Sequence, residues 1–232
     1  MPAHSVVHRM SFFPQLPRNV WRNTECIAPV GGLGDGSAGS SRATTQGGNF
    51  FVIGQGQYEQ LQRVVFGQRQ HPVFAVLDGA IIDDLPSRLR QHAPEAMCLF
   101  SGDLDPMLAA AAPYLLPLEP GAAATRLALQ EGWNAHLGIV LVADPGTDVY
   151  SLRAHLRRVL RVSAPGGTSM LFRFYDPRAF RSVVPTFDAA QRKAFFGPIH
   201  GCYTEGRSSD SALYFARDGH EAPNALSLAA AA

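Results

Sequence analysis

A dense group of charged and aromatic side chains follows an apolar segment near residue 170. Arg173, Tyr175, Asp176 and Arg178 lie within six residues, and Pro177 ends the extended segment because its ring cannot continue a strand ladder. Arginine and aromatic side chains together are typical of the central contacts of protein interfaces. The pattern therefore predicts a partner-binding cluster, and a rigid turn within the protein itself is the alternative that stays open.

An earlier segment has the same design. Val73–Leu77 is a continuous apolar run that ends in Asp78 and Gly79. Sheets of α/β proteins place ligands at such strand ends, but an aspartate before glycine also accepts backbone amides in a tight turn. We favour the second interpretation and predict that Asp78 and Gly79 form a structural turn.

A third candidate site is the arginine-rich helix predicted around residues 152–161. Leucine and valine recur on one face, and Arg153, Arg157, Arg158 and Arg161 occupy the others. Such a face is most simply solvated, but it also suits an acidic protein surface or, less well, a nucleic acid. We include the first three of these arginines among the candidate partner-binding residues. His155, in the same helix, is either an ordinary histidine or a pH-sensitive contact.

Catalytic motifs are scarce. A Cys202 nucleophile with His200 stays open as an alternative, because such pairs meet in space and not in sequence. The glycine pattern at residues 34–39 matches a dinucleotide fingerprint but lies in a Gly/Ser-rich stretch with no strand before it. His4 and His8 have metal-ligand spacing in a segment without a framework. We therefore predict no enzyme activity, no cofactor and no metal.

Short apolar runs alternate with helical patterns along the chain. Strands are predicted at residues 73–77, 96–100, 138–143, 169–175 and 212–216. Helices are predicted at residues 58–65, 83–91, 107–112, 152–161 and 188–196, with Asp105 and Asp188 as N-caps. This order predicts an α/β fold, a mixed sheet of short buried strands covered by helices.

The boundaries follow from composition. Residues 1–56 are predicted to be a largely flexible, Gly/Ser-rich segment, 57–217 the α/β domain, and 218–232 a frayed tail. A net charge of +1 gives no general attraction to nucleic acid or membranes. Three scattered cysteines, no signal peptide and no membrane-spanning run lead us to expect a cytoplasmic protein.

The order of several short motifs resembles the domain of unknown function 4123 family, over roughly residues 71–200. The specific motifs are Leu77–Ala80 (L-D-G-A) and Phe172–Arg178 (F-R-F-Y-D-P-R), with Ala112–Leu115 (A-P-Y-L) between them in the expected order. Further matching segments are Cys98–Gly102, Gly132-Trp133 leading to Gly138-Ile139, His155–Arg157 with Leu160 and Val162, and Gly167.

This resemblance implies a cytoplasmic helper of the bacterial type VI secretion system. Proteins of this family look like adaptor chaperones that bind a toxic effector, encoded nearby, and load it onto the VgrG spike, sometimes with a PAAR-tip protein. The resemblance also implies that the chain is not an enzyme. A small hydrolase or transferase that uses Cys202/His200 or the strand-end aspartates is the alternative function, and an arginine-mediated nucleic-acid binder is a weaker one.

Overall fold

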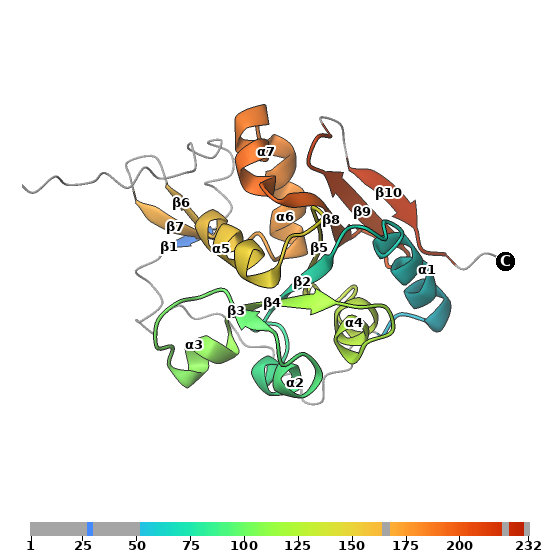
Figure 1. Ribbon diagram of the computed structural model, residues 1–232, viewed down its shortest axis with the longest axis horizontal. Coiled ribbons are helices and arrows are strands. Elements are labelled where there is room, and N and C mark those ends of the chain that lie inside the picture. The colour runs from blue at the N-terminus through green and yellow to red at the C-terminus, as the bar shows by residue number, and fades with distance from the viewer. Residues whose placement is uncertain (1–26, 30–51, 164–167, 220–222, 230–232) are drawn as a thin grey trace, which may run out of the picture.

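The computed structural model describes residues 27–29, 52–163, 168–219 and 223–229 (Figure 1). Its strands are β1 (Ile27–Pro29), β2 (Val73–Asp78), β3 (Met97–Cys98), β4 (Pro113–Leu118), β5 (Gly138–Ala143), β6 (Arg161–Ser163), β7 (Ser169–Phe172), β8 (Ile199–Glu205), β9 (Ser211–Ala216) and β10 (Asn224–Ser227). Its α-helices are α1 (Gln55–Val65), α2 (Leu85–His92), α3 (Pro106–Ala110), α4 (Ala123–Arg126), α5 (Val149–Val159), α6 (Pro177–Val183) and α7 (Ala189–Phe196). A π-helical turn, η3 (Leu127–Glu131), continues α4, and a 3-10 turn, η4 (Val184–Thr186), follows α6.

A seven-stranded sheet organises the described residues, in the order β10-β9-β8-β5-β2-β4-β3. A second sheet of three strands has the order β1-β7-β6. Every described pair in both sheets is antiparallel. The α/β class with short buried strands under helices is confirmed, whereas the mixture of strand directions is corrected. Alternating strand and helix segments do not fix direction, because a helix can also return the chain to an antiparallel neighbour.

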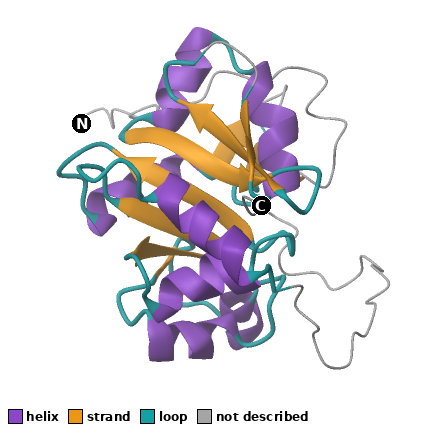
Figure 2. Ribbon diagram, turned by 90° about the vertical axis from the view of Figure 1, so that its right-hand side faces the viewer, coloured by secondary structure: helices purple, strands orange, loops and turns teal. Residues whose placement is uncertain are grey.

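Helices cover the large sheet on both faces (Figure 2). All six residues of β2 are buried, and successive side chains point to opposite faces. Phe74 and Val76 join a core with residues of α5, α6 and α7, and Ala75 and Leu77 join a second core with residues of α1 and α2. A strand buried on both faces must be apolar throughout, which explains why β2 and β5 read as continuous apolar runs.

The predicted helix caps are confirmed. Asp105 accepts the amides of Met107 and Leu108 at 2.9 Å and begins α3. Asp188 accepts the amide of Gln191 at 2.8 Å and begins α7. These bonds satisfy backbone donors that have no partner inside the helix.

Two strand boundaries differ from the prediction. The strand expected over 169–175 ends at Phe172, because the carboxylate of Asp176 caps α6 and Pro177 takes the first helical position, where no amide hydrogen is needed. The strand expected over 96–100 is only Met97–Cys98, paired with β4 alone at the edge of the sheet.

Five of the ten described strands are not among those predicted, namely β1, β4, β6, β8 and β10, and the helix predicted over 152–161 ends at Val159, before β6. The strand β8 is central to the sheet, but its sequence Ile199–Glu205 includes His200, Gly201 and Glu205 and so lacks a continuous apolar pattern. The strand β10 pairs with β9, and Leu228 beyond it is fully buried. Residues 224–228 are therefore part of the fold, and the prediction of a frayed tail is wrong for them.

The predicted flexible segment is also corrected where it is described. Residues 27–29 form β1 and pair with β7. The helix α1 begins at Gln55, and Ile53 before it is buried against the second core. The rest of that segment lies outside the described residues. In the part of the chain that is described, no helix is both long and apolar enough to cross a membrane.

Gly79 offers a test of the turn that follows β2. Its amide donates to the carbonyl of Ala112 at 3.0 Å, and a Cβ atom at this position would lie 2.2 Å from the carbonyl oxygen of Ala110. We predict that Gly79→Ala destabilises the protein by about 3 kcal/mol, because the obstructing atoms belong to the backbone. Urea denaturation measures this. Gly54→Ala is the control, since a Cβ there meets only the end of the Gln57 side chain, 3.8 Å away. Equal midpoints for the two variants would contradict the prediction.

Candidate functional site

An ion pair joins the two candidate strand ends. The Nη2 atom of Arg173, just after β7, lies 2.7 Å from Oδ2 of Asp78, the last residue of β2. The other carboxylate oxygen of Asp78 accepts the amide of Ala80 at 3.0 Å. The Asp78 side chain is 1% exposed and that of Arg173 is 28% exposed. The carboxylate is thus enclosed and satisfied by donors of the protein itself.

Opposing effects set the ionisation of this pair. Burial raises the pKa of the Asp78 carboxyl above its usual range, against the lowering effect of Arg173 and of the Ala80 amide. For Arg173, burial acts to lower the pKa, but the charge and hydrogen bond of Asp78 outweigh it and the pKa rises. A desolvated carboxylate that is already bonded to a guanidinium is poorly placed to bind a substrate. The pair acts as an internal brace.

Tyr175 is interior. It is 2% exposed, and the Arg173 guanidinium lies 5.9 Å from the centre of its ring. Phe174 beside it is fully buried and packs edge-on against the ring of Phe195. Burial raises the pKa of the Tyr175 phenol strongly. Direct contact of Tyr175 with a partner, which the sequence predicts, is therefore corrected, because the aromatic residues of this motif belong to the core.

Asp176 and Arg178 form the outer end of the motif. The Asp176 carboxylate accepts three hydrogen bonds from Arg178. The backbone amide of Arg178 donates at 2.9 Å, its Nε atom at 3.1 Å and its Nη2 atom at 2.8 Å. Burial acts to raise the pKa of Asp176, but these bonds outweigh it and the pKa is lowered. Asp176 is 3% exposed, so the expectation that it contacts a partner directly is corrected as well. Arg178, whose side chain is 47% exposed, is the outermost residue of the motif.

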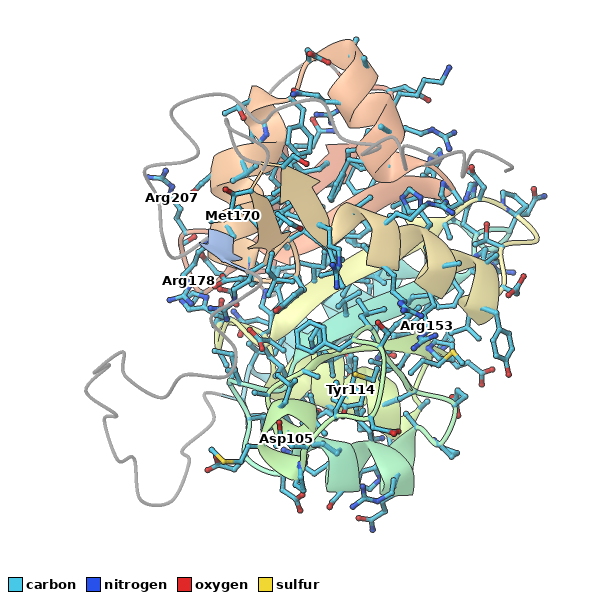
Figure 3. The ribbon with its side chains drawn as sticks, turned by 90° about the vertical axis from the view of Figure 1, so that its left-hand side faces the viewer. Asp105, Tyr114, Arg153, Met170, Arg178 and Arg207 are labelled. Atoms are coloured by element: carbon cyan, nitrogen blue, oxygen red, sulfur yellow. The ribbon has the colours of Figure 1, made fainter. Side chains whose placement is uncertain are left out.

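The arginines of α5 divide into an inner and an outer set. The Nε atom of Arg153 donates to the carbonyl of Cys98 at 2.8 Å, which ties α5 to the edge strand β3. Arg157 is half-buried and Arg158 is exposed. Within the described residues, neither makes a hydrogen bond or an ion pair. Figure 3 places Arg153 well away from Arg178, so α5 and the Arg178 edge are separate surfaces.

Burial argues against two further candidates, a Cys202 nucleophile and a His155 surface contact. Cys202 is fully buried, and burial raises the pKa of its thiol so that the unreactive protonated form is favoured. His155 is 6% exposed, and its Nε2 lies 2.7 Å from the carbonyl oxygen of Phe195, to which it donates. His155 is thus not a surface contact. The glycine pattern at 34–39 and the His4/His8 pair lie outside the described residues.

The structure also brings together a group of three residues that sequence reasoning did not predict, although it named His200 as a possible partner of Cys202. Ligand atoms of His71, Asp144 and His200 all lie within 4.8 Å of one another. No spacing in the sequence signals this group, because the three residues come from the start of β2, the end of β5 and the start of β8. Only the antiparallel order of these strands brings them together.

Breaking the ion pair tests its role as a brace. We predict that Arg173→Met lowers the free energy of unfolding by roughly 3 kcal/mol, because it leaves the buried Asp78 carboxylate without its counter-ion. Adding Asp78→Asn to that variant should restore part of the loss. Urea denaturation of the single and double variants measures the coupling. The control is Arg126→Met, on the exposed face of α4. A cost for Arg173→Met no larger than that of the control would refute the brace.

His155 should make stability depend on pH. Burial first, and then the charge of Arg158, hold its pKa below the usual value. The unfolded chain therefore takes up a proton near pH 6.5 when the folded protein does not, so stability falls as the pH drops from about 6.5 toward the folded pKa. One such group changes stability by at most about 1.4 kcal/mol per pH unit.

The difference between wild type and His155→Gln isolates this contribution, because the other histidines cancel. In stability curves measured from pH 5 to pH 8, the gap between the two proteins should be constant above about pH 7 and should narrow below pH 6.5, because only the wild type loses this contribution there. His92→Gln, a change at an exposed position, should follow the wild type throughout. Parallel curves for wild type and His155→Gln would contradict the assignment.

Comparison with known proteins supplies a family but no characterised relative. No curated protein and no solved structure matches the chain. A family model described as "Domain of unknown function (DUF4123)" matches residues 73–194, from the first residue of β2 into α7. The match covers more than half of the chain and includes the Asp78–Arg173 brace, the Asp176 cap and α5. The chain therefore belongs to the DUF4123 family.

Proposed function

We propose that the protein is an adaptor chaperone that binds a type VI secretion effector and loads it onto the VgrG spike, with a PAAR-tip protein as a possible third component. Family membership supports this proposal together with the motif resemblance, because both cover the same central part of the chain. We also propose that the protein acts as a binding protein in the cytoplasm and not as an enzyme.

The observation that carries the proposal is the outer face of α5. Arg157 and Arg158 make no hydrogen bond or ion pair with other described residues, whereas Arg153 on the same helix is held by a backbone carbonyl. Tyr150, at the start of the helix, is 70% exposed. A half-buried and an exposed arginine on the same helix as an exposed tyrosine have the composition of an interface and favour an acidic partner surface.

A second surface suits an adaptor, which must hold two proteins at once. The half-exposed Arg178 lies at a different edge of the molecule, and Figure 3 shows Arg207 and Met170 at the same edge. Asp176 holds the Arg178 guanidinium through two side-chain bonds, so this side chain is pre-ordered for contact at low entropic cost. We assign α5 to the effector and the Arg178 edge to the spike.

The enzymatic alternative finds little support. Its nucleophile, Cys202, is buried, and its strand-end carboxylates, Asp78 and Asp176, are each bonded to an arginine. General acid–base catalysis needs a carboxyl group that reaches a substrate. In the described conformation both carboxylates are directed at internal donors.

Charge reversal on α5 tests the proposal. We predict that Arg157→Glu/Arg158→Glu weakens the complex with the effector encoded by a flanking gene by at least about tenfold, because two attractions become repulsions. The complex with VgrG should be unchanged. Arg178→Glu should give the opposite pattern. Pull-down of the co-expressed proteins, followed by calorimetric titration, measures both affinities.

The matched control is Arg126→Glu, an exposed reversal on α4 in the other helical layer. Arg157→Glu/Arg158→Glu and Arg126→Glu should keep the thermal midpoint of the wild type within a few degrees. Arg178→Glu should lower it, because the buried Asp176 carboxylate loses its guanidinium partner, so its affinities are measured at a temperature at which the variant is folded. Equal loss of both complexes in every variant, or no loss in any, would remove α5 and Arg178 as binding surfaces.

A further inference from the structure

Backbone hydrogen bonds on both sides of β5 assemble His71, Asp144 and His200. The amide of Ala143, the last residue of β5, donates to the carbonyl of Pro72 at 2.9 Å, which holds the residue next to His71. The amide of Asp144 donates to the carbonyl of Pro198 at 2.8 Å, two residues before His200. The three side chains therefore rest on the rigid ends of three adjacent strands, β2, β5 and β8.

The orientation of His71 leaves a ring nitrogen available. Its Nδ1 atom lies 2.7 Å from the carbonyl oxygen of Ala143. A carbonyl oxygen only accepts, so Nδ1 carries the hydrogen and Nε2 keeps its lone pair. Histidines that bind metal ions usually donate their other ring N–H to a carbonyl or carboxylate in this way. The rings of His71 and His200 have centroids 4.4 Å apart, and a ligand atom of each side chain lies within 4.8 Å of the other.

Asp144 is oriented by Arg217. The Nη1 atom of Arg217 donates to Oδ2 of Asp144 at 2.6 Å and to the carbonyl of Gly197 at 3.2 Å, and the Arg217 amide donates to the carbonyl of His200 at 2.9 Å. One carboxylate oxygen is thus fixed by an arginine, while Oδ1 has no hydrogen-bond partner among the described residues. Carboxylates that bind metal ions are commonly held by such an outer hydrogen bond.

The group is open to solvent on one side. A surface cavity of about 510 Å³ is lined by His71 together with Gln68 and Arg69, and all three members of the group are partly exposed. An ion can therefore enter, and a fourth ligand position can be filled by water.

We propose that His71, Asp144 and His200 bind a divalent transition-metal ion of the zinc class. Two neutral imidazoles and one carboxylate suit Zn²⁺, Co²⁺ or Ni²⁺, whereas Mg²⁺ and Ca²⁺ require several oxygen ligands. Zinc bonds to histidine are about 2.0–2.1 Å long, which needs ligand atoms about 3.3 Å apart in a tetrahedral site. The observed limit of 4.8 Å means that the side chains rotate slightly inward on binding. The bound ion would fasten the ends of three strands.

Two charged neighbours set the strength of this site. Arg217 offsets the single negative charge of Asp144, and Arg69 lines the adjacent cavity, so the net charge around the ion is unfavourable. Affinity should therefore rest on the nitrogen ligands. This explains why the site should discriminate strongly against Mg²⁺ and Ca²⁺, whose binding depends on oxygen atoms and negative charge.

Titration of the untagged full-length protein with Co²⁺ tests the proposal. We expect one equivalent to give the visible absorption of a four-coordinate Co²⁺ ion, Zn²⁺ to displace it, and Mg²⁺ to leave it unchanged. Zn²⁺ should raise the Tm by several degrees, because the ion binds the folded state. His71→Gln/His200→Gln should abolish both effects. His4→Gln/His8→Gln should leave them intact, which separates the site from the N-terminal histidine pair.

Asp144→Asn provides a second variant that keeps an oxygen for Arg217 and should weaken Co²⁺ binding at least about tenfold. Circular dichroism and Tm without metal establish that each variant is folded. If the double histidine variant does not fold, Asp144→Asn decides the question alone. Absence of Co²⁺ and Zn²⁺ binding by wild type, or unchanged binding in these variants, would overturn the proposal and leave the two rings as a stacked structural pair.

Discussion

The buried ion pair between Asp78 and Arg173 connects the centre of the large sheet to the chain that leaves the small one. Asp78 ends β2, whose neighbours β4 and β5 lie on either side. Arg173 lies between β7 and the cap of α6. The contact holds the end of β2 against the segment that enters α6, while the Asp176 cap and Pro177 set where that helix begins. The second oxygen of the Asp78 carboxylate accepts the Ala80 amide, so one carboxylate joins the turn after β2 to the segment before α6.

The pair is not the main source of stability. Burying a large apolar side chain contributes roughly 1.5–3 kcal/mol, and many such side chains fill the two cores. A buried ion pair is often close to neutral when it is compared with apolar residues of similar size. The pair matters because it disfavours alternative conformations. A buried carboxylate without a partner would be costly, so conformations that separate Asp78 from Arg173 are disfavoured. The motif F-R-F-Y-D-P-R is thus mainly structural, and only its last residue, Arg178, belongs to a proposed partner surface.

Sequence patterns anticipated the parts of the fold that depend on local physics. The continuous apolar run of β5, the leucine stripe of α5 and the Asp105 and Asp188 caps follow from burial and from unpaired backbone amides, which are visible in short windows. The strand β8 was missed because it is central but contains polar residues whose partners are distant in sequence, such as Glu205 with His136. Strand direction was not accessible either, because it depends on pairings across the chain.

The candidate site shows the same division. Composition identified Arg173, Asp176 and Arg178 as a group, but it did not reveal that Asp78 is the partner of Arg173, 95 residues away. Arginine and tyrosine in a motif look the same in sequence whether they face a partner or a core. The His71, Asp144 and His200 group was invisible for a related reason, since its spacing exists only in the folded sheet.

Hydrogen–deuterium exchange of the protein alone and in complex with the product of a flanking gene distinguishes partner binding at α5 from partner binding at the strand-end motif. The proposed adaptor role predicts a stoichiometric complex in which amide protection increases over α5, residues 149–159. The hydrogen-bonded amides of residues 77–80 and of Asp176 should be protected in the free protein already and should not change. A complex that protects residues 173–176 and leaves α5 unchanged would contradict the assignment of α5 as a partner surface, because the motif at the strand end would then be the binding surface. Failure of any flanking product to bind the folded protein would contradict the adaptor function itself.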